Sequence, residues 1–162
     1  MARNGFWYAL PLGVAAGILG MIQFGENRVI ENAPASEQIA DDGRTAVEFT
    51  GAERQHIRGE MLGFLNGSQS ILDASLTADR QTIKTVASGL AKGKASPLGQ
   101  AVKQKSPPEF TQLSQGLRQS FGAIALTADT ASMAEIQGKL NSGMQKCAAC
   151  HSGFKAIERN PK

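Results

Sequence analysis

The sequence predicts an all-α protein, and three observations support that prediction. Aromatic residues make up only 6% of the 162 residues, and β-branched runs are scarce, which favours helices over sheet. From residue 50 onward, apolar residues recur every three or four positions, as the buried face of a helix requires. Segments of the form Ser/Thr-x-x-Glu precede three of these stretches and match the capping box of helix starts. We therefore expect an antiparallel four-helix bundle over residues 50–162.

Ahead of this region lies an apolar segment. Residues 6–24 contain no charge, and nineteen residues at about 1.5 Å each nearly cross a hydrocarbon layer of roughly 30 Å. Three aromatic residues at its start, residues 6–8, suit the membrane interface, and Arg3 precedes them. We expect residues 1–25 to form a single transmembrane helix that anchors the chain, with the N-terminus in the cytoplasm and the rest outside.

A cleaved signal peptide is the alternative for this segment. Ala33-Pro34-Ala35 resembles a cleavage site with small residues, but Pro34 is awkward there. The site also lies about ten polar residues beyond the apolar run, which is far for ordinary processing. We therefore favour an uncleaved anchor, and both alternatives predict an exported domain.

The next segment, residues 26–49, is polar and carries a net charge of −4. It shows neither the period of a helix nor the alternation of a strand. We expect a flexible linker between the anchor and the bundle.

The first two helices follow this linker. Thr50 and Glu53 form the first capping box, and the helix is expected to run to about Ser75. Its predicted buried face consists of Ile57, Met61, Leu65 with Phe64, Ser68, and Leu72 with Ile71. A second helix is expected to begin near Thr77 and to bury Ile83, Val86 and Leu90 before Gly93.

A basic loop is expected to join the second helix to the third. It contains Lys92, Lys94, Lys103 and Lys105, together with Pro97 and Gly99. Ser106 and Glu109 then predict another capping box, followed by the apolar positions Phe110, Leu113, Leu117, Phe121 and Ile124. Ser132 and Glu135 open the fourth helix, whose predicted face is Met133, Ile136, Leu140, Met144 and Cys147.

The fourth helix ends in the segment Cys147-Ala148-Ala149-Cys150-His151, which has the form C-x-x-C-H. This is the attachment pattern of a c-type haem. The two thiols can form thioethers with the two vinyl groups of one porphyrin, and the histidine can then ligate the iron. No other cysteine is present in the sequence to compete for them. We expect one covalently bound haem c, built into the core of the bundle.

Three other kinds of site use cysteines at this spacing. A structural zinc site needs four ligands, whereas this stretch offers three, and His56 is the only other histidine. A thioredoxin-like C-x-x-C is expected in a βαβ context, which the sequence does not suggest. A plain disulfide between Cys147 and Cys150 would close a very short loop without an evident purpose. Haem attachment is therefore favoured.

The stretch from Cys147 to Lys155 resembles the end of the cytochrome c′ family, the class II c-type cytochromes. That family carries C-x-x-C-H on the fourth helix of a bundle, followed by an aromatic and a basic residue, which Phe154 and Lys155 match. Arg54-Gln55 and Asp79 also resemble family features. The resemblance covers residues 50–160. The membrane anchor departs from the usual soluble member.

The resemblance implies two alternatives for the side of the haem opposite His151. High-spin members block it with an apolar side chain of the first helix and bind nitric oxide or carbon monoxide, and Ile57 would fill that role. Low-spin members supply a methionine from the same helix and carry electrons, and Met61 would be that sixth ligand. Candidates for the haem propionates are Arg54, Arg58 and Lys155. His56 lies off the apolar stripe, so we expect it to face solvent.

The charge of the domain favours one class of partner, and the motifs that the sequence lacks argue against two other classes of function. Residues 50–162 carry a net charge of +6, which would steer a redox partner with an acidic docking surface. No aromatic-basic stripe points to nucleic acid, and no nucleophile–base pair or phosphate loop points to an enzyme.

The expected role is single-electron transfer by a monohaem cytochrome. It would be held to the bacterial inner membrane with its haem domain in the periplasm, as part of a larger redox complex or alone. Gas binding at a five-coordinate haem is the alternative, and a bracing subunit stabilised by its haem is a third. Family members often dimerise through their first two helices, so a homodimer is one expected arrangement.

Overall fold

The computed structural model describes residues 38–93 and 95–159. The expected membrane anchor at residues 1–25 and the first part of the expected linker lie outside these residues. Among the residues described, no helix is both long enough and apolar enough to cross a membrane.

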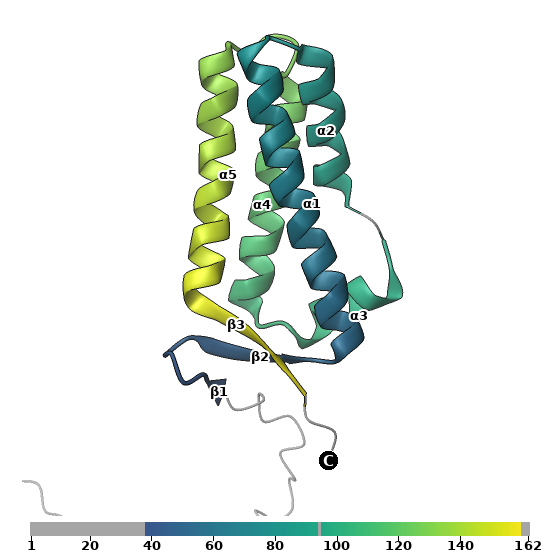
Figure 1. The fold of residues 1–162 in the computed structure, drawn as a ribbon, viewed down its shortest axis with the longest axis vertical. Coiled ribbons are helices and arrows are strands. Elements are labelled where there is room, and N and C mark those ends of the chain that lie inside the picture. Colours follow the sequence, from purple (N-terminus) through teal and green to yellow (C-terminus); the bar gives the residue numbers. More distant parts are fainter. Residues whose placement is uncertain (1–37, 94, 160–162) are drawn as a thin grey trace, which may run out of the picture. The chain divides into compact units, whose positions relative to one another are not determined.

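The described chain is mostly helical, as predicted (Figure 1). Four long helices, α1 (Gly51–Leu76), α2 (Arg80–Lys92), α4 (Pro108–Thr127) and α5 (Met133–Gly153), lie side by side with alternating directions. Around the bundle, α1 contacts α2 and α5, and α4 contacts the same two helices. Because α1 begins and α5 ends at the same end of the bundle, residues early in α1 lie beside residues late in α5.

Most of the predicted helix starts are confirmed. Thr50 Oγ1 accepts a hydrogen bond from the Glu53 amide at 3.3 Å, and the Glu53 carboxylate accepts one from the Thr50 amide at 2.8 Å. Ser132 begins α5 with the same reciprocal bonds. Asp79 caps α2 by accepting from the Thr82 amide at 3.0 Å. The capping box predicted at Ser106 is wrong, because Ser106 ends the preceding helix and Pro107 precedes α4.

A fifth helix, α3 (Pro97–Lys105), stands where the basic loop was expected. Ser96 starts it, since its hydroxyl accepts a hydrogen bond from the Gly99 amide at 3.0 Å, and Pro97 occupies the first turn. None of its residues is fully buried, which explains why no apolar stripe revealed it. It packs beside the beginning of α1.

The core of the bundle is a continuous apolar cluster. Its buried members are Phe64, Ile71, Ala74, Ile83, Ala87, Leu117, Phe121, Ile124, Ala128, Ile136 and Leu140. Several predicted core positions are wrong: Leu65, Leu72 and Met144 are about half exposed. On α1, Gly67 is buried against α2, where a Cβ would stand 2.5 Å from Leu90 Cδ1. On α5, Gly143 is buried in place of Met144.

The expected linker ends in a strand instead of continuing as a tether. β1 (Gln38–Ile39) pairs with β2 (Thr45–Phe49) antiparallel, and β2 pairs in parallel with β3 (Phe154–Glu158), which directly follows α5. Val47 and Phe49 alternate inward and are buried, which fixes the face of β2 that covers the bundle. We call these three strands the end sheet. Figure 1 shows it crossing the bundle where α1 begins and α5 ends.

Candidate functional site

The C-x-x-C-H segment lies in the last turns of α5, which ends at Gly153. Both cysteines are half-buried and unpaired, and Cys147 packs against the core cluster. His151, in contrast, is exposed to solvent. A spacing of three places Cys147 and Cys150 on one side of the helix, and His151 adjoins them.

A cavity of about 330 Å³ opens beside this segment, within the range typical of small-molecule sites. Its walls are mainly apolar and come from α1, α3, α4, α5 and the end sheet. The lining residues are Arg44, Ile57, Glu60, Met61, Phe64, Val102, Phe110, Leu113, Ser114, Leu117, Lys146, Cys147, Cys150, His151, Phe154, Lys155 and Ala156.

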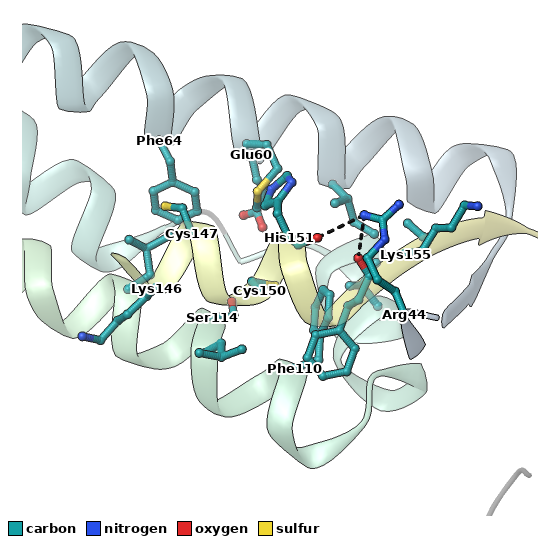
Figure 2. A pocket seen from close by; sticks show the side chains of 17 residues that line it. Arg44, Glu60, Phe64, Phe110, Ser114, Lys146, Cys147, Cys150, His151 and Lys155 are labelled. Carbon is teal, nitrogen blue, oxygen red and sulfur yellow. Dashed lines mark hydrogen bonds between the residues drawn. The ribbon is translucent and has the colours of Figure 1, made fainter. Parts of the chain in front are cut away.

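The cavity brings together six of the site residues predicted from sequence, of which Lys155 is one. Cys147, Cys150 and His151 line one wall, and Ile57 and Met61 line the wall formed by α1. Figure 2 shows Phe64 and Glu60 reaching from α1 toward the side chains on α5. Both alternatives for the side opposite His151 are therefore present in the same cavity.

The two predicted arginines lie outside this lining. Arg54 instead forms an ion pair with Glu158 on β3, with 2.8 Å between Arg54 Nη1 and Glu158 Oε2. Arg58 is exposed on α1. The cations that do line the cavity are Arg44, Lys146 and Lys155, and of these only Lys155 was considered from sequence.

His56 is also placed differently from the prediction. It is half-buried, and its Nε2 is buried without a hydrogen-bond partner among the described residues. The imidazole stands against α3, where a Cβ on Gly99 would lie 3.3 Å from Nε2. Because α3 was not foreseen, neither was the surface that covers His56.

Burial governs the chemistry of the two thiols. It raises the pKa of Cys147, and it raises the pKa of Cys150 with a smaller contribution from the neighbouring Cys147. Both groups are therefore protonated thiols at neutral pH, not preformed thiolates. A thiol can add across a vinyl group, with sulfur bonding to one carbon and hydrogen to the other, to give a thioether.

One acidic side chain, Glu60, is found among the described residues of the lining. Its carboxylate accepts a hydrogen bond from Arg118 Nη2 at 2.8 Å. Arg118 also donates to the Leu90 carbonyl at 3.1 Å, and its guanidinium lies 5.0 Å from the centre of the Phe64 ring. The positive charge of Arg118 balances the negative charge of Glu60, so this pair adds no net charge to the cavity wall formed by α1.

Arg44, which lies just before β2, joins the end sheet to the motif. Its Nη1 donates to the carbonyl oxygens of His151 at 3.0 Å and Phe154 at 3.3 Å (Figure 2). These carbonyls end α5, so the guanidinium stabilises the helix terminus that carries the motif. Sequence reasoning missed Arg44 because it appeared to belong to an unstructured linker.

The residues present fit a c-type haem. The donor set has two unpaired thiols at the required spacing and an imidazole beside them. The cavity has apolar walls suited to a macrocycle, and cations line its edge next to the end sheet. Within residues 38–93 and 95–159, no three His, Cys, Asp or Glu side chains are grouped to hold a bare metal ion.

Comparisons with protein-family models, with curated proteins and with solved structures found no match to this chain.

Proposed function

We propose that this protein is a monohaem c-type cytochrome similar to the cytochrome c′ family and that it transfers single electrons. One observation is the main support: the C-x-x-C-H segment and the α1 residues Ile57 and Met61 line the same apolar cavity. A bound haem would supply reversible one-electron chemistry at its iron.

The residues at the cavity have different roles in this proposal. Cys147 and Cys150 would hold the macrocycle as thioethers, and a ring nitrogen of His151 would ligate the iron. Arg44 fixes the backbone at His151 through its bond to that carbonyl. The apolar walls, which include Phe64 and Leu117, would keep water away from the macrocycle. Less solvent would then have to reorient when an electron is transferred, so the reorganisation energy would be small.

Met61 is the proposed sixth ligand. It is partly buried, packs against the core cluster and lines the cavity from α1. A thioether ligand would fill the remaining position of the iron and favour electron transfer over ligand binding.

Gas binding is the second candidate function, because Ile57 lines the same wall one turn earlier. If Ile57 covers the iron instead of Met61, the open position would accept carbon monoxide or nitric oxide. The two candidates therefore differ in one side chain on α1.

The proposed setting follows from charge and from the N-terminal segment. We propose a bacterial inner-membrane protein whose haem domain lies in the periplasm and meets redox partners with an acidic docking surface. Assembly into a larger membrane complex or a homodimer belongs to the same proposal. If the protein only braced an assembly, removing the haem would leave partner turnover unchanged.

The first experiment tests covalent attachment. The full chain is produced in a host that attaches c-type haem, then denatured, and its mass is measured. We expect the mass of one haem to stay with the chain, and to be lost when Cys147→Ser and Cys150→Ser are combined. Ser142→Ala, on the same helix, serves as the control and should keep the haem. A wild-type chain without haem would reject the proposal.

The second experiment decides between the two functions. Ferric and ferrous absorption spectra are recorded with and without carbon monoxide. Met61→Leu should convert a low-spin, carbon monoxide-insensitive protein into one that binds the gas, while Met144→Leu, at an exposed methionine on α5, should change nothing. A wild-type spectrum that already responds to carbon monoxide would favour gas binding.

A further inference from the structure

The edge of the cavity beside the end sheet differs from its interior. Most of the lining side chains on the helices are apolar, such as Met61, Phe64 and Leu117, whereas Arg44 and Lys155 line the cavity from the side of the end sheet. Both cations belong to segments at the end sheet. The sequence alone did not place Arg44 near the motif, whereas Lys155 follows His151 by four residues. The cavity is therefore mainly apolar, and two of the cations that line it lie on the side of the end sheet.

Arg44 keeps a hydrogen-bond donor beyond those it uses within the protein. A guanidinium has five N–H groups. Nη1 donates to the carbonyls of His151 and Phe154, while Nε and Nη2 each donate to Asp42 Oδ2, at 3.1 and 2.7 Å. These four bonds leave one N–H on Nη2.

Lys155 has a similar arrangement. Its Nζ contacts Asp41 Oδ1 and lies 3.4 Å from Asp42 Oδ2, so one of its three N–H groups remains. Neither Asp41 nor Asp42 lines the cavity, and Asp41 is largely exposed. The two carboxylates therefore hold the cations from outside the cavity, and a third cation, Lys146, lines it elsewhere.

We propose that Arg44 and Lys155 form a binding site for carboxylate groups of the ligand that occupies this cavity. This inference rests on the proposed function, in which that ligand is haem and the carboxylates are its two propionates. Haem combines an apolar macrocycle with two anionic propionates. The cavity offers mainly apolar walls for the first and these two cations for the second. Of the three propionate candidates named from sequence, Lys155 is kept, and Arg44 replaces Arg54 and Arg58, which do not line the cavity.

The test compares two arginine variants in the haem-loaded full chain. Arg44→Gln removes a guanidinium that lines the cavity. Arg54→Gln removes one that is also paired with a carboxylate, at 2.8 Å against 2.7 Å for Arg44, but lies outside the cavity. The propionate bending band in the resonance Raman spectrum reports hydrogen bonding to the carboxylates. We expect a shift to lower frequency in Arg44→Gln and no shift in Arg54→Gln.

A second variant covers the case in which Arg44→Gln does not fold. Lys155→Gln keeps the bonds from Arg44 to α5 and should also shift the band. Haem-loaded variants of Arg44 and Lys155 with the wild-type band would overturn this inference while leaving the proposed function intact. A wild-type chain without covalent haem would overturn both, and the mass measurement separates the two results.

Discussion

The two ends of the bundle use the same helices for different purposes. Far from the end sheet, Ile71, Ile83, Ile124 and Ile136 are fully buried against one another. Near the end sheet, Ile57, Phe110 and Leu113 are only half-buried around the cavity. We call these the packed end and the cavity end. The comparison shows that a regular helical pattern does not distinguish side chains that fill space from side chains that enclose it.

The two ends also differ in their polar contacts. Three charged residues that line the cavity form ion pairs. Arg44 pairs with Asp42, Glu60 with Arg118, and Lys155 with Asp41. At the packed end, Ser75 is the buried polar residue, and its hydroxyl accepts a hydrogen bond from Gln137 at 2.9 Å. The difference predicts that substitutions in the buried cluster of the packed end cause the largest losses of stability, whereas substitutions of residues that line the cavity also change ligand binding.

The largest expected effect on stability comes from truncation at the packed end. Ile124→Ala should lower the free energy of unfolding by about 2–5 kcal/mol, because Ile124 is fully buried and its neighbours cannot close the space. Leu113→Ala should cost less than about 2 kcal/mol, because Leu113 already borders a cavity. Urea unfolding followed by circular dichroism measures both. Equal losses would remove the distinction between the two ends.

Two glycines on α1 test where the packed end begins. A Cβ at Gly67 would lie 2.5 Å from Leu90 Cδ1, so Gly67→Ala should cost about 1–2 kcal/mol despite the better helix propensity of alanine. Gly63 has nothing within 4 Å of that position, and Gly63→Ala should stabilise the protein by about 0.5–1 kcal/mol. Thermal unfolding of both variants checks the opposite signs. A stabilised Gly67→Ala would mean that α1 and α2 are not closely packed there.

Acid should weaken the start of α1 at the cavity end. Lys105 donates to the buried Glu53 carboxylate at 2.7 and 2.8 Å and, with the Thr50 amide, lowers the pKa of Glu53 below its ordinary value of 4.5. Since the folded pKa is depressed, the stabilisation is present above pH 4.5 and is lost as pH falls through the lower folded value.

Glu53→Gln tests this acid dependence. The variant should be less stable than wild type at pH 7, and the gap in urea midpoint should shrink as the pH is lowered below 4.5. Adding Lys105→Gln to this variant should cost little more, because both substitutions break the same pair. A gap that is constant with pH would show that the carboxylate charge contributes nothing there.

The smallest expected effect is at the exposed pair between Arg54 and Glu158. Both side chains are largely exposed, so Arg54→Ala should cost less than about 1 kcal/mol and leave haem attachment unchanged. Urea unfolding at low and high salt measures the loss, which should disappear at high salt. A larger or salt-independent loss would assign Arg54 a role beyond this surface pair.

Several features could be predicted from residues that are close together in the sequence. The boxes at Thr50 and Ser132 were found because each bond joins residues three positions apart. The alternatives Ile57 and Met61 came from the resemblance to the cytochrome c′ family, together with a helical spacing that places both residues on one face of α1. The face of α1 was nevertheless partly mistaken, since leucines also occupy its exposed side.

Other features depend on residues that are far apart. β2 is five residues long and pairs with a strand that follows α5, so no local pattern distinguished it from a linker. Arg44 reaches the Phe154 carbonyl across 110 positions of the sequence. The exposed α3 has a cap but no buried stripe, and it therefore resembled a loop.

The sequence by itself determined the helical class, most helix starts and the thiol–thiol–imidazole chemistry of the proposed haem site. These depend on backbone hydrogen bonds and spacings that span a few residues. Only the tertiary structure decided which sides of α1 and α5 face the core, where the cavity lies and which cations line it. Those features depend on packing between helices and on pairing between distant strands. Another sequence with the same local pattern could have a different buried face or a different strand pairing.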